Sequence, residues 1–595
     1  MEITLNSKVA DMYAHPVGRD IVDKLLLQLN KPAWLISNPL VGNLKLKFIQ
    51  KLIKKQVTPN FLNTLLGLLN SEPDVPSETA VQTAPKWWKE AVFYQIYPRS
   101  FCEGGLLGII SKLDYLHDLG IDALWMSPVY DSPNDDNGYD IRDYYKIQPE
   151  FGTMEDMDQL IAELKKRGMK LVMDLVVNHT SDEHPWFQQA LCSENAPYRE
   201  FYHFVQGNKV NNWTSFFGGS AWNYYPEQDV SALHLFSKKQ MDLNWECAKM
   251  RQEIYKMVRW WLEKGVDGFR LDVINYISKQ PGLPEGDAFI GTLMGYTGIE
   301  HYFYGPRLHN HLKELKREAF EPFGAFTVGE TPGVGTQMGR LLTDGYRKEL
   351  DLIFSFDHLE TPGYSRFDDY QYDLTYLKKF YITHLNDDKG HGWNTLFFNN
   401  HDNPRMVSKI DPSGRYTDQI ARLLAVLQLT LRGTPFLFQG DETGVCNVPF
   451  RSMDEIKDVE SIGMYEELLK TVTPDEAFKR ILAGTRDHAR APICWEDNES
   501  QRGRSDSIWR FYQDLISLRK SSRSLVYGEL SFLRQKDKNL FCYTRTLDGE
   551  CFYIEVNLGV KTHKSHALKE AKLVIGNYKE TSDMLQAYEA RVYTY

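Results

Sequence analysis

Residues 154–179, MEDMDQLIAELKKRGMKLVMDLVVNH, join an amphipathic segment to a short and strongly apolar one. In residues 154–168 the apolar side chains recur at helical spacing, whereas residues 170–179 form a compact apolar run rich in valine. Parallel strands need a crossover connection, and an amphipathic helix commonly supplies it. The stretch therefore predicts a helix followed by a buried parallel strand, which is the repeating unit of an α/β fold.

The same alternation continues on both sides of this stretch. Eight short β-rich runs occur in the chain, with amphipathic segments such as residues 248–265 between them. Eight strand–helix alternations predict an α/β protein with a (β/α)8 TIM barrel, because eight parallel strands close into a barrel. The eight runs are residues 92–98, 123–130, 170–179, 268–274, 325–331, 352–358, 394–402 and 434–442.

Composition shifts divide the chain into further units. Residues 71–86 hold three prolines among polar residues and predict a linker, which sets off residues 1–70 as an N-terminal helical module. The barrel then covers residues 87–522. It includes an inserted subdomain at about 181–240, after the third strand, where the gap is too long for one helix. Alternating runs in residues 523–595 predict a C-terminal antiparallel β domain.

The N-terminal module contains a basic amphipathic stretch, residues 43–56, in which lysines alternate with apolar residues. Such a helix can lie on an anionic membrane or on a partner. More often it is the solvated face of a small helical bundle, and no catalytic constellation occurs in the module.

The overall composition excludes several classes of protein. Apolar residues make up 42% of the 595 residues and charged residues 25%, which is ordinary globular composition. A formal net charge of −11 gives no electrostatic reason to bind nucleic acid. No apolar run reaches the roughly 20 residues that cross a bilayer, and no leader sequence is recognised. Seven scattered cysteines without a CxxC pair favour reduced thiols, so we expect a cytoplasmic protein.

Polar side chains stand at the carboxyl ends of the predicted strands. In a barrel these ends meet at one rim, where catalytic groups lie. A single carboxylate there is more often a helix cap, but chance is a poor explanation for a whole set. The residues are Asp140 after the second run, Asn178 and His179 on the third, Arg270 and Asp272 on the fourth, Glu330 on the fifth, and His401 and Asp402 on the seventh.

Paired carboxylates on one rim suit the cleavage of a glycosidic bond. One must be ionised to attack or stabilise an oxocarbenium-like carbon, and the other must hold a proton for the leaving oxygen. Arg270 stands two residues before Asp272, so on a strand both side chains point to the same face. We expect the arginine to lower the pKa of this aspartate and keep it ionised.

Four of these segments, DLVVNH, GFRLDVI, TVGE and FFNNHD, resemble the signature regions of the α-amylase family of glycoside hydrolases. Further segments, among them NGYDIRDY, FFGGSAW, HDNPR and TRDHARAPICW, are similar to the oligo-1,6-glucosidase branch of that family. The resemblance covers about residues 86–595. It implies a retaining, exo-acting α-glucosidase that hydrolyses short α-glucosides without a cofactor, with a small oligosaccharide as its partner.

The resemblance also implies a role for individual residues. Asp272 would be the nucleophile that forms a covalent glucosyl-enzyme, Glu330 the general acid and then base, and Asp402 the residue that holds sugar hydroxyls. The remaining implied contacts are His179, His401 and Arg270 around the −1 sugar, Asp140 and Arg490 on the non-reducing glucose, Phe217 as a stacking partner or a core residue, and Val273 beside the +1 sugar.

One departure from the family concerns metal. Where the family has a loop rich in Asp, Asn and Gly after the first strand, residues 100–110 read SFCEGGLLGII and are about six residues shorter. The oxygen ligands that a hard cation needs are mostly absent. We therefore expect no metal at this loop.

Linkage preference and reaction type leave alternatives open. In the resembling family, valine after the nucleophile goes with α-1,6-linked substrates, so Val273 predicts isomaltose-type substrates. A maltase remains an alternative, as does a sucrose-directed transglycosylase or isomerase. The arginine-rich loop of the isomerases is replaced by residues 406–418, which hold only Lys409 and Arg415 as cations. A non-catalytic binding subunit is a remote alternative, because all three acids are present.

Overall fold

Eight parallel strands form one sheet in the order β13-β12-β11-β5-β2-β1-β15-β14. The computed structural model describes residues 2–29, 31, 34–53, 58–71, 84–388 and 392–595. Across the seam between the two end strands, Thr395 Oγ1 donates a hydrogen bond to the Ile353 carbonyl at 2.9 Å, so the barrel is nearly closed. The predicted (β/α)8 barrel is confirmed. Its strands are β1 (Phe93–Ile96), β2 (Ala123–Met126), β5 (Lys170–Leu175), β11 (Gly268–Leu271), β12 (Phe326–Glu330), β13 (Leu352–Phe354), β14 (Thr395–Leu396) and β15 (Thr434–Phe438).

Helix α11 (Met154–Lys166) shows why the crossover segments are helical. Thr153 Oγ1 accepts a hydrogen bond from the Asp156 N–H at 3.2 Å, and the Asp156 carboxylate accepts one from the Thr153 N–H at 2.8 Å. This capping box satisfies two N–H groups that the helix itself cannot. Acidic residues in the first turn and lysines in the last complement the helix dipole, while one apolar face is buried against the barrel.

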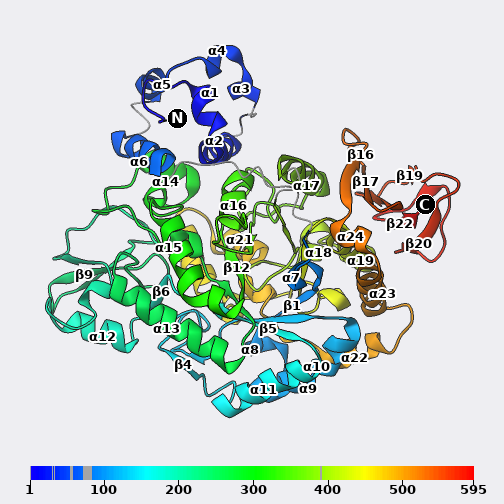
Figure 1. Ribbon diagram of the computed structural model, residues 1–595, viewed down its shortest axis with the longest axis horizontal. Coiled ribbons are helices and arrows are strands. Elements are labelled where there is room, and N and C mark those ends of the chain that lie inside the picture. Colours follow the sequence, from blue (N-terminus) through cyan, green and yellow to red (C-terminus); the bar gives the residue numbers. More distant parts are fainter. Residues whose placement is uncertain (1, 30, 32–33, 54–57, 72–83, 389–391) are drawn as a thin grey trace.

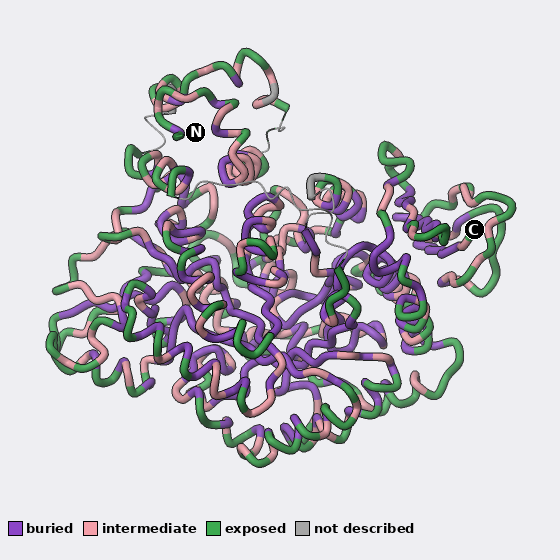
Figure 2. The backbone as a smooth tube through the Cα atoms, viewed as in Figure 1, coloured by how far each residue is buried: buried purple, intermediate pink, exposed green. Residues whose placement is uncertain are grey.

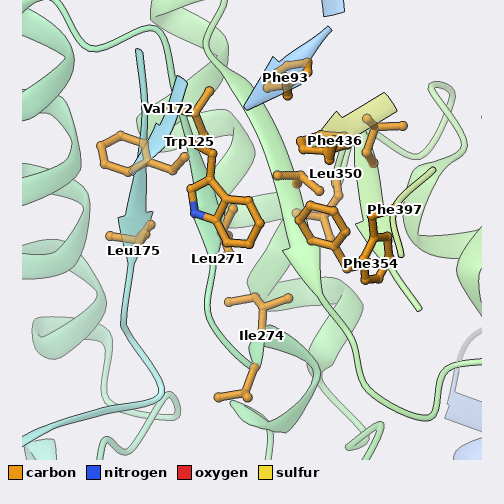
Figure 3. Close-up of a cluster of buried hydrophobic side chains, with 14 of the residues drawn as sticks. Phe93, Trp125, Val172, Leu175, Leu271, Ile274, Leu350, Phe354, Phe397 and Phe436 are labelled. Atoms are coloured by element: carbon orange, nitrogen blue, oxygen red, sulfur yellow. The ribbon is translucent and has the colours of Figure 1, made fainter. Parts of the chain in front are cut away.

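Aromatic and aliphatic side chains from the barrel strands and the loops beside them pack together in a buried cluster (Figure 3). Phe93 and Phe436 stack at 4.4 Å between ring centres, and Trp125 and Phe354 stack at 5.1 Å. Figure 2 shows buried residues concentrated along these central strands. Because side chains pack closely in the interior, a functional site has to lie at the rim, where the strands end.

Two smaller β units extend the barrel. After β5 the chain forms helix α12 (Pro185–Cys192) and a three-stranded sheet in the region predicted as an inserted subdomain. Near the C-terminus a five-stranded antiparallel sheet in the order β16-β17-β18-β22-β20 agrees with the predicted β domain. The strands are β7 (Phe204–Gln206), β8 (Trp222–Tyr225), β9 (Val230–Leu233), β16 (Glu529–Leu533), β17 (Leu540–Leu547), β18 (Glu550–Asn557), β20 (Lys572–Gly576) and β22 (Ala590–Thr594).

The N-terminal module is helical and rests on the barrel through α2 and α6 (Figure 1). Most of the predicted linker lies outside the described residues, as does the end of the predicted basic helix. No helix in the part of the chain that the structure describes is long and apolar enough to cross a membrane. The module comprises α1 (Val9–Ala14), α2 (Pro16–Gln28), α3 (Trp34–Ser37), α4 (Pro39–Gly42), α5 (Leu46–Ile53) and α6 (Pro59–Ser71).

Candidate active site

Neighbouring strands carry two of the predicted acids to the same edge of the barrel. Asp272 directly follows β11, and Glu330 is the last residue of β12. The two strands pair in parallel with Leu271 opposite Gly329, so their ends are level. The exposed fractions of the two acid side chains are only 9% and 11%, respectively.

A single buried guanidinium joins these acids. Arg270 Nη1 lies 2.6 Å from Asp272 Oδ1, and Nη2 lies 2.5 Å from Glu330 Oε2. A third carboxylate, Asp174 on β5, lies 2.7 Å from Nη1. Arg270 is only 1% exposed, so one cation faces three buried carboxylates with little help from water.

Burial raises the pKa of both rim acids, and one cation shared among three carboxylates does not offset it. Burial raises the pKa of Glu330 to about 8, and the nearby carboxylates add to the shift while Arg270 opposes it. Burial also raises the pKa of Asp272 to about 6, against the lowering effect of Arg270 and of a hydrogen bond with Glu330. Arg270 lowers the pKa of Asp272 as expected, but desolvation outweighs the ion pair, so the net pKa lies above its ordinary value rather than below it.

Asp402 lies after β14, with 24% of its side chain exposed. Arg490 Nη2 lies 2.8 Å from Asp402 Oδ1, and His401 Nε2 lies 3.1 Å from Oδ2. Burial by itself raises the pKa of Asp402, but the positive charges around it more than offset this, so the net pKa is below its ordinary value. Burial lowers the pKa of His401 to about 3, so at neutral pH three nearby arginines supply that positive charge.

Arg486 forms a second charged cluster beside Asp402. Its Nη2 lies 3.1 Å from Asp136 Oδ1 and 2.6 Å from Asp458 Oδ1. Its Nη1 lies 3.5 Å from Asp402 Oδ1. The guanidinium carbon lies 5.3 Å from the centre of the Phe217 ring, at the range of a cation–π contact. Phe217 therefore lies at the rim beside this cluster and is only partly buried.

Asp140 occupies a different position from the one expected. It is fully buried, and its Oδ1 accepts hydrogen bonds from Ser132 Oγ at 3.0 Å and the Asp136 N–H at 3.1 Å. Its Oδ2 accepts a bond from the Asp135 N–H at 2.8 Å. Both oxygens thus hold their own loop in shape. The carboxylate that this loop presents to Arg486 is Asp136, four residues earlier.

Tyr139 connects His179 to the acids. The His179 Nε2 atom lies 3.1 Å from the Tyr139 carbonyl oxygen, and burial lowers the pKa of this imidazole. The Tyr139 hydroxyl lies 2.6 Å from His401 Nε2 and donates to Asp174 Oδ2 at 3.1 Å. Two neutral imidazoles are therefore arranged around one tyrosine between the two clusters of charge.

Val273 adopts a left-handed backbone conformation, with φ +36° and ψ 40°. Such a conformation is strained for a β-branched residue. Its N–H donates to Glu330 Oε2 at 3.0 Å, so the turn fixes the carboxyl of the neighbouring strand. The strand predicted for residues 268–274 ends at Leu271 for this reason, and Val273 is not a strand residue.

The functional candidates that sequence reasoning missed are Asp136, Tyr139, Asp174 and Arg486. Each stands in a segment that already drew notice for another residue. The clearest signal is Asp174, because a carboxylate inside an otherwise apolar parallel strand needs a partner. Arg486 stands four residues before Arg490, one turn away along the chain, and spacing alone gives no preference between the two.

Residues 100–110 stand where the resembling family has its metal loop, and they are largely helical. Helices α8 (Pro98–Phe101) and α9 (Gly105–Ser111) occupy this segment, and the Leu106 N–H donates to the Phe151 carbonyl at 2.8 Å. Within the described ranges, no group of three or more His, Cys, Asp or Glu side chains is arranged to hold a metal ion.

Comparison with known families gives one strong match. The model of the alpha-amylase catalytic domain matches residues 95–528. Oligo-1,6-glucosidase from Parageobacillus thermoglucosidasius is 43% identical over 555 residues, which cover 85% of this chain and 98% of that protein. Trehalose-6-phosphate hydrolase from Bacillus subtilis is 40% identical, over 77% of this chain and 87% of that protein.

Solved structures show the same architecture. Trehalulose synthase from Pseudomonas mesoacidophila MX-45 superposes with a TM-score of 0.80 at 35% identity, over 86% of this chain and all of that chain. Trehalose-6-phosphate hydrolase from Bacillus licheniformis gives 0.79 at 36% identity with the same coverage. These similarities agree with the barrel described above, which carries three acids at its rim.

Proposed function

Since the chain belongs to the alpha-amylase family of glycoside hydrolases, we propose that it is a retaining, exo-acting α-glucosidase that hydrolyses short α-glucosides. The observation that carries this proposal is the pair of acids on one guanidinium, with the pKa of Asp272 raised to about 6 and that of Glu330 to about 8. At neutral pH one is ionised and the other protonated. Glycosidic cleavage needs this division.

The first chemical step uses both acids at once. The Asp272 carboxylate attacks the anomeric carbon and forms a glucosyl ester, while Glu330 donates its proton to the leaving glycosidic oxygen. A retaining enzyme keeps its two carboxyl groups about 5–5.5 Å apart, whereas an inverting enzyme leaves about 6.5–9.5 Å for a water between them. A shared guanidinium and a mutual hydrogen bond support the closer, retaining arrangement.

The second step returns both acids to their starting states. Glu330, now a carboxylate, takes a proton from water, and the resulting oxygen nucleophile attacks the anomeric carbon and displaces Asp272. Arg270 contacts both carboxyls and so stabilises whichever of them is ionised at each stage. Glucose leaves with its original anomeric configuration.

We assign sugar binding to the charged groups around Asp402. This acid stays ionised and partly exposed, so its oxygens can accept bonds from sugar hydroxyls. The Asp136–Arg486 pair beside it, with Phe217 under the guanidinium, provides polar contacts and an apolar face for the non-reducing glucose. In this assignment Asp140 shapes the loop that presents Asp136 rather than binding sugar itself.

The same rim favours hydrolysis over isomerisation. Of the two cations after the HDNPR segment, Lys409 is buried and donates to the Leu359 carbonyl at 2.9 Å. It is therefore unable to steer an acceptor sugar. Arg415 is the one exposed cation in residues 406–418, all of which the structure describes, so this segment offers no cluster of cations to hold a released sugar for transfer.

We further propose a preference for α-1,6 linkages: the Val273 N–H contacts the general acid, which would place this residue beside the leaving sugar. An apolar wall there changes selectivity by about 10–200-fold. A panel of isomaltose, maltose, sucrose, trehalose, trehalose 6-phosphate and panose, with chromatography of the products, tests it. Isomaltose should be hydrolysed faster than maltose, with a smaller gap in Val273→Thr. A preference for maltose would leave the acids in place and make the protein a maltase.

We also propose a cytoplasmic location. All seven cysteines are free thiols in the structure, including the exposed Cys192 and Cys494. Exposed thiols that form no disulfide are typical of proteins in a reducing compartment.

A further inference from the structure

Helix α16 (Thr336–Thr343) follows the strand of the general acid, and its own N-cap residue supplies no side-chain cap. Its N-cap residue is Gly335. The first N–H groups of a helix have no partner within it and need an acceptor. Here Asp20 of the N-terminal module supplies one: its Oδ2 accepts from the Met338 N–H at 2.6 Å, and its carboxylate also accepts from the Gln337 N–H.

These two hydrogen bonds form an N-cap in which the capping residue is far from the helix in the sequence. Gln337 and Met338 are the second and third residues of the helix, which are the donors that a capping side chain normally satisfies. Gly335 allows the approach, because a Cβ there would lie 2.6 Å from the Asp20 carboxyl carbon. The Asp20 carboxyl group thus occupies the space that a side chain at position 335 would need, although the two residues stand more than 300 positions apart.

The capped end of the helix is joined to Glu330 by a short loop, residues 331–335. At the barrel side, the Thr331 N–H donates to the Phe354 carbonyl at 3.1 Å, and Asn275 Nδ2 donates to the Pro332 carbonyl at 3.4 Å. At the other side, the loop ends at the helix that Asp20 caps. Movement of that helix end would therefore be transmitted to the loop and to the last residue of β12.

Other contacts fix α2 in the position that the cap requires. Lys24, one turn after Asp20, pairs with Asp357 at 2.7 Å. On α6, Thr64 Oγ1 lies 3.1 Å from His301 Nδ1. Between these polar contacts, apolar residues of the module and barrel line a pocket that is open to solvent. Apolar residues of α6 are buried in the same cluster as the barrel core, so packing and polar contacts together hold the module there.

We propose that Asp20 is a positioning residue for the general acid, and that the N-terminal module is a clamp on the loop that directly follows it. The inference rests on the proposed function, because it takes Glu330 as the acid. Burial raises the pKa of Asp20 to about 7, yet a carboxyl oxygen accepts N–H bonds whether or not the group is protonated. An asparagine should therefore replace it, and an alanine should not.

The test compares variants of the full chain. Asp20→Ala removes the cap, and Asp20→Asn keeps an acceptor of the same size. Gly335→Ala displaces the Asp20 carboxyl group, because the added methyl group needs the same space. Asp23→Asn is the matched control, because Asp23 stands on the same helix but accepts from the Tyr13 hydroxyl at 2.9 Å within the module. For each variant, kcat and KM are measured with isomaltose and with p-nitrophenyl α-glucoside, well below the unfolding temperature.

Asp20→Ala should lower kcat on isomaltose roughly fivefold with KM unchanged, the ratio that corresponds to a capping interaction of about 1 kcal/mol. The aryl glucoside needs less proton donation, so its rate should change less than about twofold. Gly335→Ala should have the same effect on kcat as Asp20→Ala. The double variant should lower kcat no further than either single variant, since both substitutions remove the same contact. Asp20→Asn and Asp23→Asn should match the wild type.

An equal loss on both substrates, or no loss, would overturn the clamp. Amide hydrogen exchange at Gln337 and Met338 provides a second measurement that does not depend on turnover. It should accelerate in Asp20→Ala and stay unchanged in Asp20→Asn, and equal exchange in all variants would also refute the inference. If the wild type cleaves no glucoside, the proposed function fails while hydrogen exchange still decides whether the clamp exists. If Asp20→Ala does not fold, Gly335→Ala is compared with the wild type in its place.

Discussion

At the scale of single residues, Asp272 and Glu330 share one guanidinium and still differ in pKa. Burial raises the pKa of Glu330 to about 8; two other carboxylates add to the rise, while Arg270 and the Val273 N–H oppose it. Burial and the charge of Asp174 also raise the pKa of Asp272, but Arg270 and the hydrogen bond with Glu330 limit it to about 6. The difference separates nucleophile from acid.

Glu330→Gln tests the acid role. The amide has no proton to donate, so hydrolysis of isomaltose should fall about 10²–10⁴-fold, while formation of the glucosyl-enzyme from an aryl glucoside with an activated leaving group should fall less. Azide should restore turnover of the aryl glucoside, because an anionic nucleophile needs no general base. Steady-state and burst kinetics measure both steps.

Glu183→Gln is the control for this variant, since Glu183 is an exposed carboxylate that pairs with Arg142 at 2.9 Å. It should leave both rates unchanged. Equal losses on both substrates in Glu330→Gln, without azide rescue, would remove Glu330 from the acid–base role.

The two pKa values also predict a pH profile. Activity needs Asp272 ionised, so kcat/KM should rise as pH increases through about 6. It also needs Glu330 protonated, so kcat/KM should fall as pH increases through about 8, with a maximum near neutrality. The two limbs of the profile report apparent pKa values of the coupled pair, not one residue each. Glu330→Gln should lose the alkaline limb, and an alkaline limb that persists in this variant would assign it to another group.

Sequence reasoning at this scale identified residue types better than their orientation. The segment NDDNGYD offers several carboxylates, and only the folded turn decides that Asp140 faces inward while Asp136 faces Arg486. The strained backbone of Val273 leaves no pattern in the sequence, because a β-branched residue ordinarily predicts a strand. Tertiary contacts hold it in a conformation that its own preference opposes.

At the scale of elements, the eight strands lie within the eight predicted runs, because a barrel strand is buried on both faces and so appears as a continuous apolar run. Strand ends were predicted less well, since the polar rim residues extend the runs beyond the hydrogen-bonded strand. The fold was thus predictable from periodicity. The position of each rim side chain depends on turns that periodicity does not specify.

The segment after β1 supports a prediction about metal. In residues 100–110 the only carboxylate is Glu103, which is exposed. Close backbone packing shapes the turn: Gly105 has φ +57°, and a Cβ there would lie 2.3 Å from the Phe151 carbonyl oxygen. EDTA should therefore change neither activity nor the unfolding temperature in a thermal-shift assay. A decrease that calcium reverses would demonstrate a metal site elsewhere in the chain.

At the scale of the whole molecule, the N-terminal module and the barrel depend on each other more than the proline-rich linker predicted. Residues 1–70 carry nine Lys and Arg against four Asp and Glu, although the complete chain has a net charge of −11. The acidic Asp357 pairs with Lys24 of this basic module. Sequence patterns do not predict such contacts, because a cap or an ion pair between distant segments has no local spacing.

A chain that starts at Pro85 tests this dependence. It lacks the Lys24–Asp357 pair and the Asp20 cap, and it exposes apolar barrel residues such as Ile290 and Met294 that line the cavity under the module. If the lost contacts together contribute about 2 kcal/mol, the unfolding temperature should fall by roughly 2 °C. The barrel motifs remain complete, so turnover of a small aryl glucoside should stay within about twofold of the full chain. Differential scanning calorimetry and circular dichroism measure the first effect, and Lys24→Ala in the full chain should reproduce part of it. An unchanged unfolding temperature would mean that the module rests on the barrel without stabilising it.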